Sequence, residues 1–525
     1  MLSRVAAVKA PRTHNRCRVT GSSGRRREGG ESEPQRPNMS RHLFYSALLL
    51  VVMMCCGSGG AAEIAGQSTV SKFEWKDIKD EEDVTVVSLG APGLLNVGSD
   101  VFVVAEAKNK EKEGQGSFTG IASQLLMEAV EKKDNTPVEI MNDANTKTQF
   151  LEESISADSK KKVDVSRPTT VMKGKDIYML VGKYSRNDAQ GSGGGDSGLL
   201  LVRGEVGGEE NNKKIDWKNT ESLPRGLFGT ELESLTGLFG GGGSGVKMHD
   251  DTLAFPVEGT KKGDAQNDVK TVSLILYSSK DTDESWKLSK EAPDGGCSDP
   301  SVVEWGEKNK KLIMMTACDD GRRRVYESGD MGESWTEALG TLSRVWGNKH
   351  GEGEKAVRSG FITATIDGED NRNVMLVTLP VYSKEADKKE TENGKGKLHL
   401  WLTDNTHIVD IGPVSDDDAA ASSLLYKSAG SETNKEKLIA LYEKKKDDGK
   451  PSHSLWSVLL TDQLQRVKDV LKTWKKVDET VSKLCPSESD ARDALPDTPC
   501  SPTVKITDGL VGFLSDNFSE NTWSD

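Results

Sequence analysis

Short apolar runs separated by polar or glycine-rich segments occupy the chain from about residue 84 to residue 460. Most runs are four to eight residues long and rich in Val, Leu, Ile and Tyr, which favours β-strands. No helical pattern of about 10–15 residues alternates with them, so a sandwich, a barrel or a propeller remains. The clearest runs are Val101–Ala105, Ile177–Val181, Leu199–Val202, Val272–Tyr277, Leu312–Met315, Val374–Leu379, Leu398–Leu402, Leu438–Tyr442 and Leu455–Leu460.

One segment near the end of the chain has a different period. Between Thr461 and Leu484 the apolar residues recur every three or four positions, at Leu464, Val467, Val470, Leu471, Trp474, Val477, Val481 and Leu484. This spacing predicts an amphipathic helix, and Thr461 or Asp462 is expected to cap its first turn. We expect the helix to pack on the strand domain, with a helix lying on a membrane surface as the alternative.

The first 62 residues differ from the rest of the chain. Residues 1–43 are basic and irregular, an apolar run follows at Phe44–Cys56, and small residues follow at Gly57–Ala62. This order is typical of a cleaved signal peptide, and the apolar run is shorter than the roughly 20 residues that span a bilayer. The basic stretch is long for a signal, so either Met1 or Met39 is the start. We therefore expect export through the secretory pathway to the cell surface or the medium, with nuclear import through the leader's arginine triplet as the alternative.

The charge balance excludes one class of partner. The net charge is −13, and the leader holds ten basic and three acidic residues, so its removal changes the net charge by −7, to −20. A surface this acidic argues against a general nucleic-acid binder. After the signal we expect neither a membrane span nor a lipid-anchor signal in this chain.

Cysteine usage agrees with export. Three of the seven cysteines lie in the leader, and the remaining four predict two disulfides. We favour Cys297 with Cys318 and Cys485 with Cys500, because each pair is close in sequence, while the other two pairings stay open. A zinc site is the alternative, but the spacings do not suit it, and no metal or other cofactor is expected. Asn517 begins a glycosylation sequon, which is consistent with export.

Two segments share the pattern Ser-x-Asp-x-Gly-x-Ser/Thr-Trp, known as the Asp box. One copy contains Ser279, Asp281 and Trp286, with Asp283 at the Gly position, and the other contains Ser328, Asp330, Gly332 and Trp335. In such a hairpin turn the Asp accepts hydrogen bonds from turn amides, the Gly supplies a positive φ and the Trp buries its ring. The copies begin 49 residues apart, which fits one four-stranded propeller blade per box.

The boxes and several other segments resemble the trans-sialidase superfamily of trypanosome surface proteins. The segments are Cys297–Pro300, Arg322–Ser328, Gly340–Gly347, Leu400–Asn405 and Gly509–Leu514. The resemblance covers roughly residues 70–525. It implies an all-β fold: after the leader at 1–62, a six-bladed sialidase-type β-propeller over 63–460. A linker helix and the start of a lectin-like domain would then occupy 461–525, so the chain ends where that domain would begin.

The resemblance also implies a set of catalytic groups. In this family three arginines bind the sialic-acid carboxylate, a tyrosine assisted by a glutamate attacks the sugar, and an aspartate is the acid and base. The matching positions here carry other residues. Gly90, Ala317 and Lys395 stand at the three arginines. Glu106 stands at the aspartate, Asp299 at the glutamate and Ala421 at the tyrosine.

Magnitudes decide what these replacements imply. Losing one preorganised charged contact costs about 2–4 kcal/mol of transition-state stabilisation. We therefore expect a non-enzymatic surface or shed glycoprotein, a host-cell adhesin or decoy antigen whose partners are host-cell glycoconjugates or surface proteins. The alternative is an active exo-α-sialidase or trans-sialidase, which needs other arginines at the centre. Arg322–Arg324 form the available cluster, although we expect them on a blade strand before the second box. A third possibility is a truncated gene product with no stable surface role.

Overall fold

The computed structural model divides the chain into two units, Met1–Val70 and Ser71–Asp525. All described residues belong to the second unit. They are 72–78, 84–111, 116–126, 135–156, 159–184, 198–208, 213–224, 228, 234–262, 269–278, 285–306, 310–338, 342–346, 357–366, 372–382, 396–429, 436–445, 453–484, 518–519 and 522–523.

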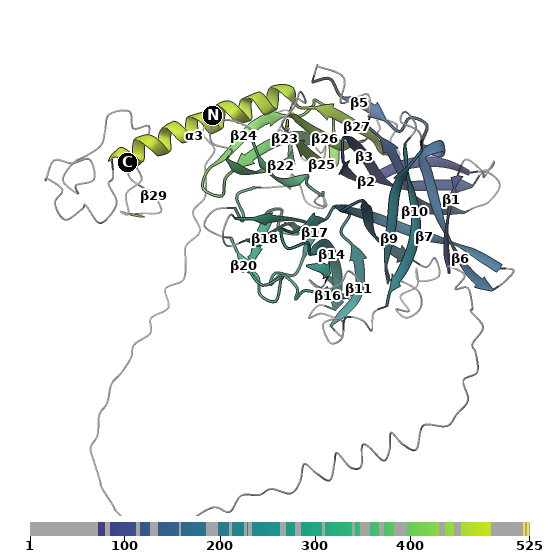
Figure 1. Ribbon diagram of the computed structural model, residues 1–525. Coiled ribbons are helices and arrows are strands. Elements are labelled where there is room, and N and C mark those ends of the chain that lie inside the picture. The colour runs from purple at the N-terminus through teal and green to yellow at the C-terminus, as the bar shows by residue number, and fades with distance from the viewer. Residues whose placement is uncertain are drawn as a thin grey trace, which may run out of the picture. The chain divides into compact units, whose positions relative to one another are not determined.

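Ten strands from the first half of this unit form one sheet (Figure 1). Its strand order is β10-β9-β8-β7-β6-β4-β3-β2, with β1 beside β6 and β12 beside β7. The β12–β7 pair is parallel, and the other neighbours are antiparallel. The strands are β1 (Phe73–Asp77), β2 (Val84–Val97), β3 (Asp100–Glu111), β4 (Ser117–Leu125), β6 (Thr148–Ser156), β7 (Ser159–Lys173), β8 (Asp176–Tyr184), β9 (Gly198–Gly207), β10 (Lys214–Leu223) and β12 (Gly243–Ser244).

Four further antiparallel sheets follow along the chain. One is formed by β11 (Leu235–Gly240), β14 (Leu253–Lys262), β15 (Val269–Ser278) and β16 (Trp286–Leu288), with β13 (Val246–Lys247) beside β14. The next contains β17 (Cys297–Trp305), β18 (Lys311–Cys318), β19 (Arg323–Ser328) and β20 (Thr336–Glu337). The third contains β21 (Phe361–Thr365), β22 (Asn373–Tyr382), β23 (Gly396–Thr403) and β24 (Ile408–Pro413). The last contains β25 (Ala419–Lys427), β26 (Lys437–Lys445), β27 (His453–Leu459) and β5 (Val138–Ile140). A 3-10 helix η2 (Ala144–Lys147) and a hairpin of β28 (Phe518–Ser519) and β29 (Thr522–Trp523) complete the elements.

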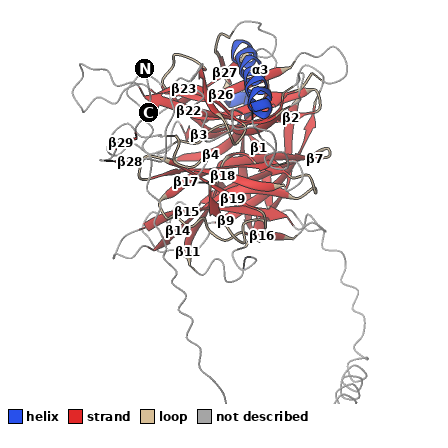
Figure 2. Cartoon of the chain, turned by 90° about the vertical axis from the view of Figure 1, so that its left-hand side faces the viewer, coloured by secondary structure: helices blue, strands red, loops and turns tan. Residues whose placement is uncertain are grey.

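The sheets surround a common centre and close into a ring. Strand β2 contacts both β7 and β25, β17 contacts β14 and β21, and β21 contacts β25. The ring closes because β5, from the first half of the chain, pairs with β27 near its end, with Ile140 opposite Leu455. This is a propeller-like arrangement, and Figure 2 shows strands throughout with α3 on one side. The expectation of an all-β fold is confirmed.

The continuous apolar runs arise because the sheets are covered on both faces. Along β8, Ile177, Met179 and Val181 pack into one core cluster, while Tyr178 and Leu180 pack into another. Alternate side chains of a strand point to opposite faces, so a strand buried on both faces becomes apolar at every position. Each of the nine runs predicted from the sequence lies on a strand, with Leu460 one residue past the end of β27.

The helix α3 (Thr461–Leu484) has the predicted bounds. Its Leu464 and Val467 are buried in the core of the last two sheets, and the Trp474 ring stacks on His407 with centroids 4.8 Å apart. The expected capping by Thr461 or Asp462 is replaced by a side chain from elsewhere. Asn135 Oδ1 accepts hydrogen bonds from the backbone N–H groups of Thr461 (2.9 Å) and Asp462 (3.3 Å). A cap supplied across about 325 residues has no local sequence signal.

Candidate functional site

The second Asp box forms the hairpin turn that its residues predict. Asp330 Oδ1 accepts hydrogen bonds from Ser328 Oγ (2.8 Å) and the Ser334 amide (2.9 Å), and Gly332 has a φ of 81°. The Trp335 ring is partly buried, and its Nε1 donates to the Lys290 carbonyl (3.0 Å). Hydrogen bonds from Ser334, and then from Ser328, lower the pKa of Asp330 to about 2. The turn therefore has a structural role.

The first box is described only in part. Ser279 and Asp281 lie outside the described residues. Trp286 is buried and packs against Phe255 with ring centroids 5.7 Å apart. It begins β16, the outermost strand of its sheet, just as Trp335 directly precedes β20.

A disulfide links Cys297 to Cys318, which lie opposite each other on β17 and β18. This is one of the two pairs favoured from the sequence. Cys485 and Cys500 lie outside the described residues, as do Lys395 and the sequon at Asn517.

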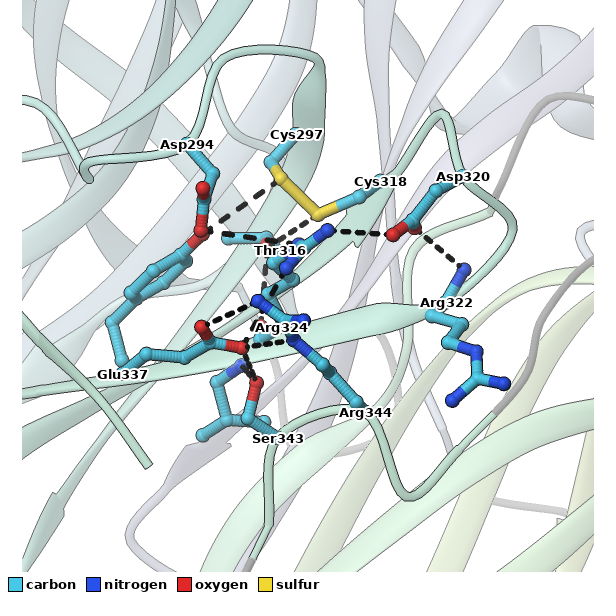
Figure 3. Close-up of polar contacts among 12 residues, drawn as sticks. Asp294, Cys297, Thr316, Cys318, Asp320, Arg322, Arg324, Glu337, Ser343 and Arg344 are labelled. Atoms are coloured by element: carbon cyan, nitrogen blue, oxygen red, sulfur yellow. Dashed lines mark hydrogen bonds and ion pairs between the residues drawn. A yellow bond between two sulfur atoms is a disulfide. The ribbon is translucent and has the colours of Figure 1, made fainter. Parts of the chain in front are cut away.

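The side chains of Arg322–Arg324, beside the disulfide, do not converge on one site (Figure 3). Arg324 binds Asp320 (2.6 Å) and lies near Glu337, whose carboxylate also receives two hydrogen bonds from Arg344. The Arg322 side chain lies apart from this group. Arg323 and Arg324 open β19, the strand before the second box, as the sequence predicts. Arg323 alone of the three is fully buried.

A group of charged side chains gathers where several sheets meet. We call it the central cluster, and it comprises Glu106 on β3, Arg167 on β7, Glu258 on β14, Asp299 on β17, Arg358 just before β21, and Glu443 on β26. Two of the predicted positions, Glu106 and Asp299, are members. A third, Gly90, adjoins it, because a Cβ atom built on Gly90 would lie 3.4 Å from Glu443 Oε1.

One backbone device recurs three times around this cluster. In β2, β7 and β17 the strand register shifts at a residue followed by proline, namely Ala91, Arg167 and Asp299. Each of these residues has a positive φ, of 47°, 52° and 49° respectively. Such a β-bulge leaves one residue outside the ladder. The backbone N–H of that residue therefore needs an acceptor other than the neighbouring strand, and the proline that follows has no N–H of its own.

In each case the acceptor is a glutamate. It lies on a strand that comes before the bulged strand in the order around the ring. Ala91 N donates to Glu443 Oε1 (2.7 Å), Arg167 N donates to Glu106 Oε2 (3.0 Å), and Asp299 N donates to Glu258 Oε1 (2.7 Å). We call these three contacts the glutamate latches. They give Glu106, which stands at the position matched to the family's acid/base residue, a definite structural contact.

The guanidinium groups of the cluster are held by the chain itself. Arg167 Nη1 lies 2.7 Å from Glu258 Oε2. Arg358 is buried, and its Nη1 donates to the carbonyls of Gly242 (2.5 Å) and Pro300 (3.4 Å), while Nη2 lies 3.9 Å from Asp299. Burial lowers the pKa of Arg358, and the nearby Asp299 carboxylate opposes this effect.

The cluster as a whole carries more carboxylates than guanidiniums. Its four acidic and two basic side chains give a formal charge of −2 when all are ionised, and Lys108 beside Glu106 and Arg323 beside Asp299 bring the sum to zero. His453 Nδ1 lies 3.1 Å from Glu443 Oε2 and adds a positive charge only when protonated. Burial raises the pKa of Glu106, although the hydrogen bond from the Arg167 amide opposes the rise.

Of the remaining predicted positions, the structure describes Ala317 and Ala421. Ala317 is buried on β18, opposite Ser298 on one side and Arg323 on the other. Arg323 Nη2 donates to the Val357 carbonyl (2.8 Å), and burial lowers its pKa to about 10, with Asp299 opposing. Ala421 lies at a register shift in β25, next to Ser422.

Sequence reasoning missed Arg167, Glu258, Arg358 and Glu443. A signal for the bulges exists, because Ala91-Pro92, Arg167-Pro168 and Asp299-Pro300 place proline inside or beside apolar runs, where strands tolerate it only at edges or bulges. Nothing local marks the glutamates, which lie 41 to 352 residues from the amides that they bind.

Two searches of the described residues bear on other chemistries. No group of three or more His, Cys, Asp or Glu side chains in this part of the chain is arranged to hold a metal ion. None of the helices described combines the length and apolar character that a membrane span requires.

The comparisons with known proteins agree with this architecture. A family model described as a BNR repeat-like domain matches residues 91–443. A Trypanosoma cruzi protein named Sialidase 85-1.1 is 32% identical over 456 residues, covering 83% of this chain and 54% of the relative. Another T. cruzi protein, named sialidase, is 35% identical over 330 residues, covering 61% of this chain and 26% of the relative. This chain therefore spans about half or less of the length of these relatives.

Solved structures of sialidases also resemble this chain. Trypanosoma rangeli sialidase is 30% identical, with a TM-score of 0.59 over 84% of this chain and 64% of that one. A structure of the same sialidase in complex with sialic acid is 31% identical, with the same TM-score and coverage. Together with the Asp-box turn and the ring of sheets, these likenesses place the chain in the trans-sialidase superfamily, among proteins with BNR repeat-like domains.

Proposed function

We propose that this chain is a catalytically degenerate member of the superfamily, a surface or shed glycoprotein that acts as a host-cell adhesin or decoy antigen. The central cluster carries the proposal. A sugar carboxylate needs guanidinium groups that are free to bind it bidentately, whereas Arg167 is paired with Glu258 and Arg358 is held by two carbonyls. With Lys108 and Arg323 counted, the charges at the centre balance, so the cluster offers an anionic sugar no net attraction.

Two buried tyrosines, Tyr326 and Tyr442, do not offer a ready nucleophile. Their hydroxyls donate to Asp294 (2.9 Å) and Asp417 (2.5 Å), and neither carboxylate is a member of the central cluster. Burial raises the pKa of both hydroxyls, which disfavours the phenolate.

The decisive experiment measures turnover and binding on the secreted chain, residues 63–525. We expect no release of fluorophore from an umbelliferyl sialoside and no detectable binding of sialyllactose by calorimetry, with an active trypanosome sialidase as the positive control. Turnover that exceeds the hydrolysis rate in buffer would overturn the proposal.

An active exo-α-sialidase or trans-sialidase is the second candidate, and one observation favours it. Arg323 and Arg358 both interact electrostatically with Asp299, so guanidiniums from new positions do lie near the matched carboxylate. Tyr382 interacts with Arg323 and would be the candidate nucleophile. If turnover were found, its loss in Tyr382→Phe and its retention in Tyr326→Phe would establish this relocated site.

The adhesin role predicts binding to host cells. Labelled chain should bind host cells whether or not their surface sialic acid has been removed enzymatically, because the proposal does not use a sialic-acid clamp. Binding that disappears after the cells are treated with a sialidase would contradict it. The Cys297–Cys318 disulfide supports an oxidising compartment, and we propose cleavage of the leader at 1–62 during export.

We also propose that the ring has six blades. The ten-stranded sheet would count as two, one built on β2, β3 and β4 and one on β7, β8, β9 and β10, and the four smaller sheets would supply the others. The contact of β2 with both β7 and β25 supports this division, because adjacent inner strands of a propeller touch in this way. A crystal structure of the secreted chain would test the count.

A further inference from the structure

A groove of about 410 Å³ lies along the strands β17 and β21. Strand β17 begins near Asp299 and β21 begins just after Arg358, both in the cluster. The groove is lined by the second half of β17 and the residue after it (Val302–Gly306), by the whole of β21 (Phe361–Thr365) and by Ser244–Lys247. None of the six residues of the central cluster lines the groove, so its occupancy does not depend on whether the cluster is catalytic.

Two strands present unpaired edges to this groove. Both β17 and β21 are terminal strands of their sheets, each paired on one side only. Thr378 N donates to the Gly360 carbonyl, and antiparallel ladders alternate, so the pairs 362/376 and 364/374 carry the ladder hydrogen bonds. The N–H and C=O groups of Thr363 and Thr365 consequently point away from β22, toward the groove.

The same alternation applies to β17. Cys318 N donates to the Arg322 carbonyl, which assigns the even-numbered residues of β18 to β19 and the odd-numbered ones to β17. Backbone groups of Val302 and Glu304 therefore point away from β18. The strands β17 and β21 touch where Ser301 Oγ donates to the Ser359 carbonyl (3.1 Å), and the groove opens beyond that contact. Unpaired edges of this kind are templates for an added strand.

The charged side chains of the groove determine which sign of charge a ligand should carry. The charged residues that line the groove are two lysines, Lys247 and Lys310, and Glu304, which accepts from His249 N (3.2 Å) and Nδ1 (2.5 Å) and lies 3.7 Å from Lys310 Nζ. The side chains of Lys310 and Lys247 are 34% and 42% exposed. The pairing of Lys247 with Asp251 is exposed and therefore weak. The Lys247 ammonium group can thus turn to a ligand carboxylate, while Lys310 balances the charge of Glu304.

We propose that this groove binds an extended acidic peptide segment of a partner protein by strand addition. The main chain of the peptide would pair with the free edge of β21 at Thr363 and Thr365, and one of its alternate acidic side chains would reach Lys247. This inference goes beyond the proposed function, and its failure would leave that function untouched.

The first test uses a blocked hexapeptide of alternating threonine and glutamate, titrated by calorimetry into the secreted chain. Three matched peptides serve as probes of mechanism: the same peptide with lysine for glutamate, and two versions N-methylated at alternate residues, one for each set of amides. We expect binding of the acidic peptide, at least about tenfold weaker binding of the basic one, and loss of binding for one N-methylated version. Equal binding of all peptides, preference for the basic one, or no binding at about 1 mM would overturn the proposal.

Variants of the chain locate the site. Thr363→Pro removes the N–H that faces the groove but leaves the ladder pairs at 362 and 364, while Thr363→Val keeps that N–H and the side-chain shape. We expect about tenfold weaker binding in the first and unchanged binding in the second. A double variant, Lys247→Gln with Lys310→Gln, should abolish the preference for the acidic peptide, and Lys287→Gln on β16 is its control. Unchanged selectivity in the double variant would overturn the assignment. If Thr363→Pro does not fold, the N-methylated peptides still decide the question on the unaltered chain.

Discussion

The Asp-box turn and the central cluster both use carboxylates that accept backbone hydrogen bonds, but over very different distances along the chain. Asp330 binds an amide four residues away within a single turn. In the glutamate latches, Glu258 binds an amide 41 residues away, and Glu443 binds one 352 residues away. The turn is exposed, and the latches join sheets at a buried centre. The turn therefore shapes one hairpin, whereas the latches hold separate sheets in register with one another.

The largest expected effect comes from breaking a latch. In Glu258→Ala, the Asp299 amide loses its acceptor and the partly exposed Arg167 loses its ion pair, so the free energy of unfolding should fall by about 3 kcal/mol, mainly because the amide is left without a partner. Urea denaturation of the segment 63–525 measures this. Glu258→Gln, which keeps an acceptor for the amide, is the matched control and should lose less. Equal losses in the two variants would show that the hydrogen bond to the bulge contributes nothing.

The second-largest loss of stability is expected when the disulfide beside the second Asp box is removed. Cys297 and Cys318 close a loop with a sequence separation of 21 residues, for which loop-closure entropy gives about 3 kcal/mol. The double variant Cys297→Ala with Cys318→Ala should lose up to that amount in the same denaturation experiment. A reducing agent should destabilise the unaltered chain and leave the double variant unchanged. Sensitivity of both to reduction would contradict this assignment.

Breaking the turn should cost less than breaking a latch. Asp330→Ala removes an exposed acceptor of local hydrogen bonds, so we expect a loss of about 1 kcal/mol. Asp330→Asn keeps one oxygen and should lose less. A loss in Asp330→Ala as large as that in Glu258→Ala would refute the contrast between local and long-range carboxylates.

The smallest effects are expected in the pH dependence, where the two regions should have opposite signs. The pKa of Asp330 is lowered to about 2 in the fold, so its contribution to stability is present above its unfolded pKa of about 3.9 and is lost as pH falls toward 2. The pKa of Glu106 is raised in the fold, so its contribution is present below its unfolded pKa of about 4.3 and is lost as pH rises through the folded value.

Stability measured against pH in two variants separates these contributions. Relative to the unaltered chain, Asp330→Asn should lose less stability on acidification, and Glu106→Gln should lose less on the alkaline side of the Glu106 titration. Identical pH profiles for the two variants would contradict the difference in sign.

The same contrast explains which features of the structure could be predicted from the sequence. The turn at Ser328–Trp335, the nine apolar runs, the bounds of α3 and the Cys297–Cys318 pair were all predictable, because each depends on residues close in sequence. The centre was only partly predictable. The resemblance brought Gly90, Glu106 and Asp299 to one place, whereas Arg358 was missed because it enters between two sheets without any surrounding motif. The Asn135 cap on α3 was missed for the same reason.

The closure of the ring through β5 has a consequence for how the propeller unfolds. Ile140 pairs with Leu455, and Glu443 of the last sheet binds Ala91 of the first. An open array of repeats has end units that can fray and melt separately. Here both chain-terminal sheets are engaged with each other, so neither has a free outer side from which to fray. Denaturation of this ring should therefore be cooperative, with its first and last sheets lost in a single transition.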